Sequence, residues 1–288
     1  MNNKFVFNRF VDVLALDGKK YVRNFGITFA VLCSLNTGLW LLSAFFGFSM
    51  PVMVRWMVIY VAVFLSAILV PAKAFGDINL QREGVRFAML PASNLEKYLS
   101  YVLYCLLTPF AVALVSYGLD ALLTLLPVGG FDDYIRHLGF LGATSDFLND
   151  MNVPSSDLAG FDTMISRLGS LESWNYLVGI LFCAALFMFG NLLFKTHKTG
   201  KTFGIMIGFN YALSMVLQTL VLATNFRTLF PGPLSIGPFG IHPDPNSVDF
   251  GAIGDFATGS MAVTVIFYIL LAIGLYLGIY FKLKNQKY

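Results

Sequence analysis

The sequence contains few charged residues. Only 12% of its 288 residues are Asp, Glu, Lys or Arg, whereas 57% are hydrophobic, and soluble domains average about 25% charged residues. So little charge cannot cover a water-facing surface, which excludes an ordinary soluble domain. The three cysteines are too few for a disulfide scaffold, and each lies in an apolar run, where a lone cysteine behaves as a small hydrophobe. These are Cys33, Cys105 and Cys183.

The chain also lacks the motifs of several enzyme classes. There is no complete phosphate-binding loop, because the nearest stretch, residues 199–202, has no earlier glycine and no preceding strand. The histidines His137, His197 and His242 fall in three different loops with no ligand spacing. We therefore expect no cofactor, no metal and no enzymatic activity in this chain, and any ATP hydrolysis would come from another one.

Charges inside the apolar runs are equally scarce. Ion-coupled carriers usually place ionisable groups within their spans. Here Arg55 falls near the outer start of a span, and Asp120 follows Ser93 by about 40 Å of helix, beyond a hydrocarbon core of about 30 Å. Because neither charge is expected within the membrane, an external energy source is favoured over proton or sodium coupling.

Six apolar runs are long enough to cross a bilayer, which takes about 20 helical residues. We expect each to be a helix, because lipid offers no partner for backbone amides. The predicted fold is therefore an all-α, polytopic membrane domain over residues 26–288. The six spans are expected at 26–47, 51–71, 95–118, 174–194, 202–224 and 260–281.

Charge distribution predicts the orientation. Fifteen of the nineteen Lys and Arg residues fall in the N-terminal segment, the loop 72–97, the loop after the fourth span and the C-terminal tail. Cytoplasmic loops are rich in Lys and Arg, so both termini are expected in the cytoplasm. The chain itself is expected in the cytoplasmic (inner) membrane. The acidic loop 127–173 and the proline-rich loop 225–259 would then be external. They could form a substrate-release gate, a partner site or passive connections.

The N-terminal segment, residues 1–25, is predicted to be an interfacial helix. Lys4, Asn8 and Asp12 recur every four residues, and mostly apolar residues line the opposite face. We expect Gly18 to end this helix. The segment could bind the surface of an anionic membrane, or it could simply anchor the first span.

The loop 72–97 carries the most informative pattern. Residues 77–90 are short, charged and partly amphipathic, which favours a cytoplasmic helix lying across the membrane face. Pro91 then disfavours helical geometry at the residue before it. Ser93 and Glu96 have the spacing of a capping box, which would begin the third span.

This layout resembles the membrane subunits of type-2 ATP-binding-cassette exporters. Those permeases have an interfacial helix, six spans, and a coupling helix followed by a Leu-Pro-x-Ser-like stretch and a Glu. Here the matching residues are Arg86, Leu90, Pro91, Ser93 and Glu96. The resemblance implies a permease working by alternating access, with membrane lipid, a second permease subunit and a separate ATPase as partners. No nucleic-acid partner is expected.

The resemblance also implies roles for single residues. Arg82, Glu83 and Arg86 would contact the ATPase, and Pro91 with the Ser93–Glu96 cap would transmit movement to the third span. A solvated loop face followed by a simple helix cap is the other interpretation. A non-transporting six-span scaffold, sensor or immunity protein is the alternative function.

Two further polar residues and a glycine repeat leave choices open. Asn210 and Gln218 could line a substrate path, although hydrogen bonding between helices is favoured. Gly200, Gly204 and Gly208 recur every four residues, which lets helices approach closely. The partner helix could belong to this chain or to a second permease subunit.

Overall fold

The computed structural model describes residues 5–79, 89–126, 131, 155–229, 234–237, 240–243 and 250–285. Over these ranges the chain is helical, as predicted, with one short hairpin that was not predicted. The α-helices are α1 (Phe7–Phe46), α2 (Val52–Lys73), α4 (Asn94–Thr124), α6 (Ser155–Leu193), α7 (Lys198–Leu229) and α8 (Phe250–Asn285). The shorter elements are the 3-10 turn η1 (Gly76–Asn79) and the antiparallel strands β1 (Leu234–Gly237) and β2 (Gly240–Pro243).

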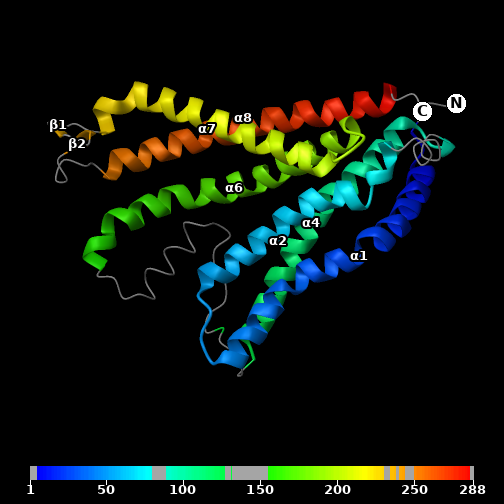
Figure 1. Cartoon of the computed structure of the whole chain (residues 1–288), viewed down its shortest axis with the longest axis horizontal. Helices are drawn as coiled ribbons and strands as arrows, with labels where there is room; N and C mark the ends of the chain where they lie inside the picture. Colours follow the sequence, from blue (N-terminus) through cyan, green and yellow to red (C-terminus); the bar gives the residue numbers. More distant parts are fainter. Residues whose placement is uncertain are drawn as a thin grey trace. The chain divides into compact units, whose positions relative to one another are not determined.

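The chain divides into two compact units. Unit 1 comprises Met1–Ile135, Val178–Met206 and Tyr268–Tyr288, and unit 2 comprises Arg136–Leu177 and Ile207–Phe267. Unit 1 contains all of α1, α2 and α4, which pack against one another (Figure 1).

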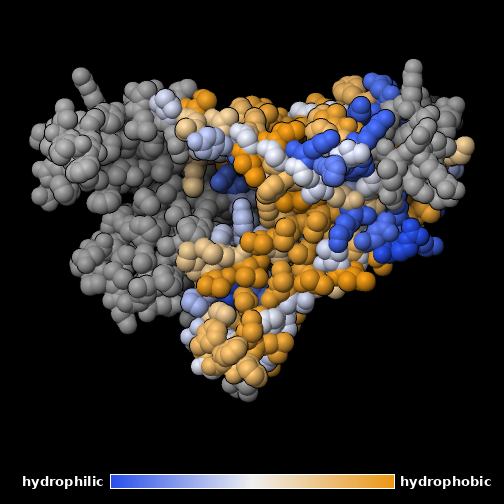
Figure 2. All heavy atoms as spheres, in the orientation of Figure 1, coloured by the Kyte–Doolittle hydropathy of each residue, from blue (hydrophilic) through white to orange (hydrophobic). Residues whose placement is uncertain are grey.

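Five of the described helices contain segments long and apolar enough to cross a membrane. Large apolar side chains cover much of the described surface in Figure 2, and hydrophilic residues gather toward the end where α1 begins. The chain is thus an α-helical, multi-pass membrane protein. α7 is helical over the fifth predicted run, and its crossing of the membrane stays a prediction. The five segments are Phe7–Phe46, Val52–Lys73, Asn94–Thr124, Trp174–Leu193 and Met261–Asn285.

Helix directions in unit 1 follow from pairs of contacts. α1 and α4 run parallel, because Arg9 bonds to Glu96 near their starts and Asn36 bonds to Asp120 farther along both. α8 ends where α4 begins, since the Tyr98 hydroxyl donates to a carbonyl near the end of α8. The start of α1, the start of α4 and the end of α8 therefore lie at one end of unit 1.

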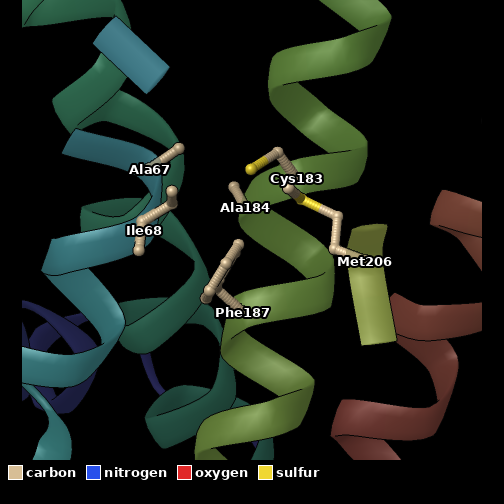
Figure 3. Close-up of a cluster of buried hydrophobic side chains, with 6 residues drawn as sticks. All are labelled: Ala67, Ile68, Cys183, Ala184, Phe187 and Met206. Atoms are coloured by element: carbon tan, nitrogen blue, oxygen red, sulfur yellow. The ribbon is translucent and has the colours of Figure 1, made fainter. Parts of the chain in front are cut away.

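Small side chains bring α2, α6 and α7 together in the core of unit 1. Ala67 and Ile68 of α2 face Cys183, Ala184 and Phe187 of α6, and Met206 of α7 completes the cluster (Figure 3). The alanines let the helices approach, and the larger side chains fill the remaining space. This packing holds the α6–α7 pair against α2.

The prediction that Gly18 ends a separate interfacial helix is wrong. α1 continues from Phe7 through Phe46 and crosses the expected boundary at residue 25 without a break. Gly18 instead makes room for a neighbouring helix: a Cβ there would lie 2.5 Å from the Tyr104 hydroxyl oxygen. That hydroxyl donates to the Leu14 carbonyl over 2.9 Å. The glycine thus serves close packing rather than termination.

The helices also extend farther than the apolar runs. The predicted loop 127–173 is wrong from residue 155 onward, because α6 begins at Ser155. The predicted loop 225–259 is shorter as well, since α7 continues to Leu229 and α8 begins at Phe250. Outside the hydrocarbon a helix needs no apolar surface, so hydrophobicity marks where it crosses the membrane rather than where it ends.

Candidate functional site

The structure describes half of the predicted coupling residues. Arg82, Glu83 and Arg86 lie outside the described residues. Pro91 is exposed just before α4, whereas Ser93 and Glu96 are buried at its first turn. The site can therefore be built from the two ends of the segment 76–93, which connects α2 to α4.

The predicted capping box is confirmed. The Ser93 hydroxyl accepts from the Glu96 backbone N–H over 3.3 Å, and the Glu96 carboxylate accepts from the Ser93 N–H over 2.8 Å. Both bonds satisfy amides that have no partner within the helix. The end of the segment is therefore fixed to α4 in a single geometry.

Glu96 also holds α1, which the sequence did not predict. The Arg9 guanidinium donates to both carboxylate oxygens through Nε and Nη2, each over 2.8 Å. The Val6 N–H donates over 2.8 Å to the same carboxylate. The Glu96 side chain is fully buried, while that of Arg9 is 29% exposed. A two-pronged Arg–carboxylate contact is strong and directional, so one carboxylate joins the segment, α4 and the start of α1.

Further polar contacts continue this attachment along α1 and α4. Ser100 donates to the buried Asp17 carboxylate over 2.6 Å. Tyr104 reaches the backbone of α1 next to Gly18, and its ring stacks on Tyr21 with centroids 5.4 Å apart. The first turns of α4 thus cannot move without α1.

The other end of the segment is held by α6 and α7. The Asn191 amide donates to the Phe75 carbonyl over 3.1 Å, and the Lys198 ammonium donates to the Gly76 carbonyl. We call these two contacts, together with the Glu96 contacts to Arg9, Val6 and Ser93, the junction. The junction ties both ends of segment 76–93 to α1, α4, α6 and α7.

A second polar cluster lies toward the opposite end of α4, about 36 Å from Glu96 at 1.5 Å per residue. Asp120 accepts from Arg55 Nη1 over 3.1 Å and from Asn36 Nδ2 over 2.8 Å. All three residues are buried, and the Phe131 ring covers the guanidinium with its centroid 4.3 Å away. We call Asn36, Arg55 and Asp120 the distal triad, which joins α1, α2 and α4.

Sequence reasoning considered the two charges of the distal triad separately and missed their pairing. Arg55 is the fourth residue of α2, and Asp120 is the fifth from the end of α4. A buried charge is rarely tolerated without a partner, and each helix supplies one charge of opposite sign near the same end. That requirement was the signal that could have paired them.

The two proposed substrate-lining residues both lie on α7, in unit 2. Asn210 is half-buried on α7 in unit 2, and the Gln218 side chain lies outside the described residues. Their lining role stays a prediction. In the part of the chain that the structure describes, no three His, Cys, Asp or Glu side chains are grouped to hold a metal ion.

No protein-family model, curated protein or solved structure matches this chain.

Proposed function

We propose that this chain is the permease subunit of an ATP-driven exporter of the type-2 ATP-binding-cassette kind, located in the inner membrane. A separate ATPase binds segment 76–93 from the cytoplasm, where both termini also lie. Two permease subunits, from one gene or two, enclose the path of the substrate. ATP-driven approach of the ATPases pushes the segments and switches the spans between inward-open and outward-open states.

The observation that carries this proposal is the attachment of segment 76–93 at both ends. Glu96 fixes its end to α1 and α4, and Asn191 fixes its beginning to α6. A loop that only connected two spans would need no such set of buried bonds. Force applied to this segment reaches at least four helices, as a coupling element requires.

Charge supports the cytoplasmic location of the segment. The end of unit 1 at which the segment lies also carries exposed cations on four helices and on the loop between α6 and α7, as cytoplasmic faces do. The only exposed acidic residue described near this end is Asp12 on α1. The exposed cations are Lys19, Arg23, Lys73, Lys195, Lys201, Lys282 and Lys284.

The proposal is tested by capturing the ATPase on the purified chain in lipid nanodiscs. The bound protein must contain a phosphate-binding loop and hydrolyse ATP in a vanadate-sensitive manner. The double variant Glu83→Ala with Arg86→Ala is expected to lower capture at least tenfold without preventing membrane insertion. Its matched control is Asp133→Ala with Arg136→Ala, which removes a pair of the same spacing and charges from the predicted external loop.

Capture that survives the first double variant, or falls equally with the control, would contradict the assigned coupling surface. A wild-type chain that binds no ATPase would instead support the non-transporting scaffold, sensor or immunity protein.

A further inference from the structure

The start of segment 76–93, which we call the coupling segment, is held through its backbone. Asn191 and Lys198 come 116 and 122 residues after the carbonyl groups that they bind. These carbonyls, of Phe75 and Gly76, belong to the turn that follows α2, and the Phe75 carbonyl also accepts from the Ile78 N–H over 3.2 Å. Because the acceptors are backbone atoms, only the two donor side chains determine whether the contacts exist.

The donors suit a helix C-terminus. The carbonyl end of a helix carries partial negative charge, which a nearby ammonium stabilises. Lys198 supplies a positive charge to the turn after α2. Asn191 is 2% exposed and supplies a neutral donor beside it. The two nearest lysines behave differently, because Lys195 and Lys201 are exposed. Within the described part of the segment, the Lys198 ammonium lies on the Gly76 carbonyl.

Asn191 is itself part of a rigid group. Its amide lies 3.4 Å from the Tyr101 hydroxyl, which donates to the Met188 carbonyl of α6. The fully buried Tyr101 ring also packs edge-on against Phe75, with centroids 5.0 Å apart. Phe75, the second residue after α2, is thus held by α4 and α6 together.

α6 and α7 are joined closely beside these donors. A Cβ placed on Gly190 would lie 2.0 Å from Thr202 Oγ1, so the two helices touch where Gly190 has no side chain. Thr202 is buried, and its hydroxyl donates to the Lys198 carbonyl over 2.8 Å. The α6–α7 hairpin that carries both donors is consequently packed as one body at this level.

We propose that Asn191 and Lys198 are positioning residues that connect the coupling segment to the α6–α7 hairpin. Through them, displacement of the segment by the ATPase moves α6 and α7 together with α2. This inference rests on the proposed function. Without the two donors, the ATPase would still bind the segment, but its push would reach the hairpin only indirectly, through the packing of α6 against α2 and α4.

The test uses the full chain with its captured ATPase in nanodiscs. Asn191→Leu and Lys198→Met remove the donors at similar side-chain volume. Lys195→Met, three residues before Lys198, is the matched control, and Lys198→Arg restores a donor. Spin labels at Lys19→Cys on α1 and Lys201→Cys on α7, both exposed positions, report the distance between the helices with and without ATP and vanadate.

We expect the wild type, Lys195→Met and Lys198→Arg to change the α1–α7 distance when ATP is trapped. In Asn191→Leu and Lys198→Met this change is expected to fall to less than half, while ATPase capture stays within twofold of the wild type. Hydrogen exchange of the peptide covering residues 74–79 is expected to accelerate at least tenfold in the same two variants. Exchange needs no ATPase, so it reports the attachment independently of the proposed function.

Accelerated exchange with an unchanged distance response would overturn the inference, and so would unchanged exchange. Loss of capture in the donor variants would also overturn it, because the residues would then belong to the ATPase-binding surface. A wild type that captures no ATPase refutes the proposed function, and with it the positioning role. Lys198→Met changes a half-buried residue, which keeps the test available if Asn191→Leu does not fold.

Discussion

Breaking the distal triad should show whether α1, α2 and α4 depend on a buried ion pair. Arg55 is 0% exposed in its side chain and Asp120 is 2% exposed, so neither charge can turn to solvent when its partner is removed. Removing one partner of such a pair costs about 3–5 kcal/mol, whereas replacing both by apolar residues is often close to neutral. Arg55→Met and Asp120→Leu should each be severely destabilising.

The double variant should be much more stable than the two single variants suggest. Added independently, their costs would reach about 8 kcal/mol, whereas a true pair leaves about 1–3 kcal/mol. That remainder arises because the Asn36 amide donates to Asp120 over 2.8 Å and loses its acceptor in the double variant.

The chain contains its own reporters for this experiment. Cys33, Cys105 and Cys183 are free and buried, so a thiol-reactive fluorogenic dye labels them only as the protein unfolds. A cost of about 4 kcal/mol corresponds to a melting temperature lower by about 10 °C for a protein of this size. Arg23→Met, an exposed charge, is the control and should stay within about 0.5 kcal/mol of the wild type.

If Arg55→Met or Asp120→Leu lost no more stability than Arg23→Met, the reasoning would be refuted, because the remaining buried charge would not need its partner. A double variant that loses the full sum would refute it equally, since the two charges would not be acting on each other.

The same dye assay tests three further substitutions. Gly18→Ala should lower the melting temperature by several degrees, and Tyr104→Phe in the same chain should restore part of the loss by removing the oxygen 2.5 Å from the added Cβ. Gly190→Ala should destabilise more strongly, and Thr202→Ala should relieve it; equal melting temperatures with and without Thr202→Ala would contradict the close crossing of α6 and α7. Glu96→Gln can keep one acceptor oxygen for the Ser93 N–H, but its amide nitrogen cannot accept from the Val6 N–H and Arg9 Nη2, which bond to the other oxygen. It should therefore cost about 2–3 kcal/mol, and a change below about 0.5 kcal/mol would argue against the junction.

The crossing segments were predictable because lipid imposes a simple condition on sequence. A helix in hydrocarbon must be apolar over about 20 residues, and five of the six predicted runs are helices of that kind. The Ser93–Glu96 cap was predictable for a similar reason, because its partners lie three residues apart and form a local motif.

The rest depended on contacts between distant residues. Glu96 binds Arg9 across 87 positions, and Asn191 binds the Phe75 carbonyl across 116, and no local pattern encodes which helices become neighbours. Gly18 was misread for the same reason: glycine marks either a helix end or a close approach. Only the position of Tyr104 distinguishes the two.

The extent of α6 shows a different limit. A continuous apolar run marks only the part of a helix that lies in lipid. Residues 158–171 instead show an amphipathic helical period, which the prediction of a loop overlooked. The apolar residues spaced three or four apart are Leu158, Phe161, Ile165, Leu168 and Leu171. Two serines and an aspartate at positions 155–157 are residues that favour a helix N-terminus. Local start signals of this kind were the better guide to where α6 begins.

The central claim is that segment 76–93 faces the cytoplasm, where an ATPase can bind it. Met89 is 75% exposed in that segment, and Ser49 is exposed in the turn between α1 and α2. Single cysteines at these positions can be labelled in whole cells with a membrane-impermeant maleimide. The account predicts that Ser49→Cys reacts in intact cells and Met89→Cys only after the membrane is opened. Labelling of Met89→Cys in intact cells, with Ser49→Cys protected, would contradict it.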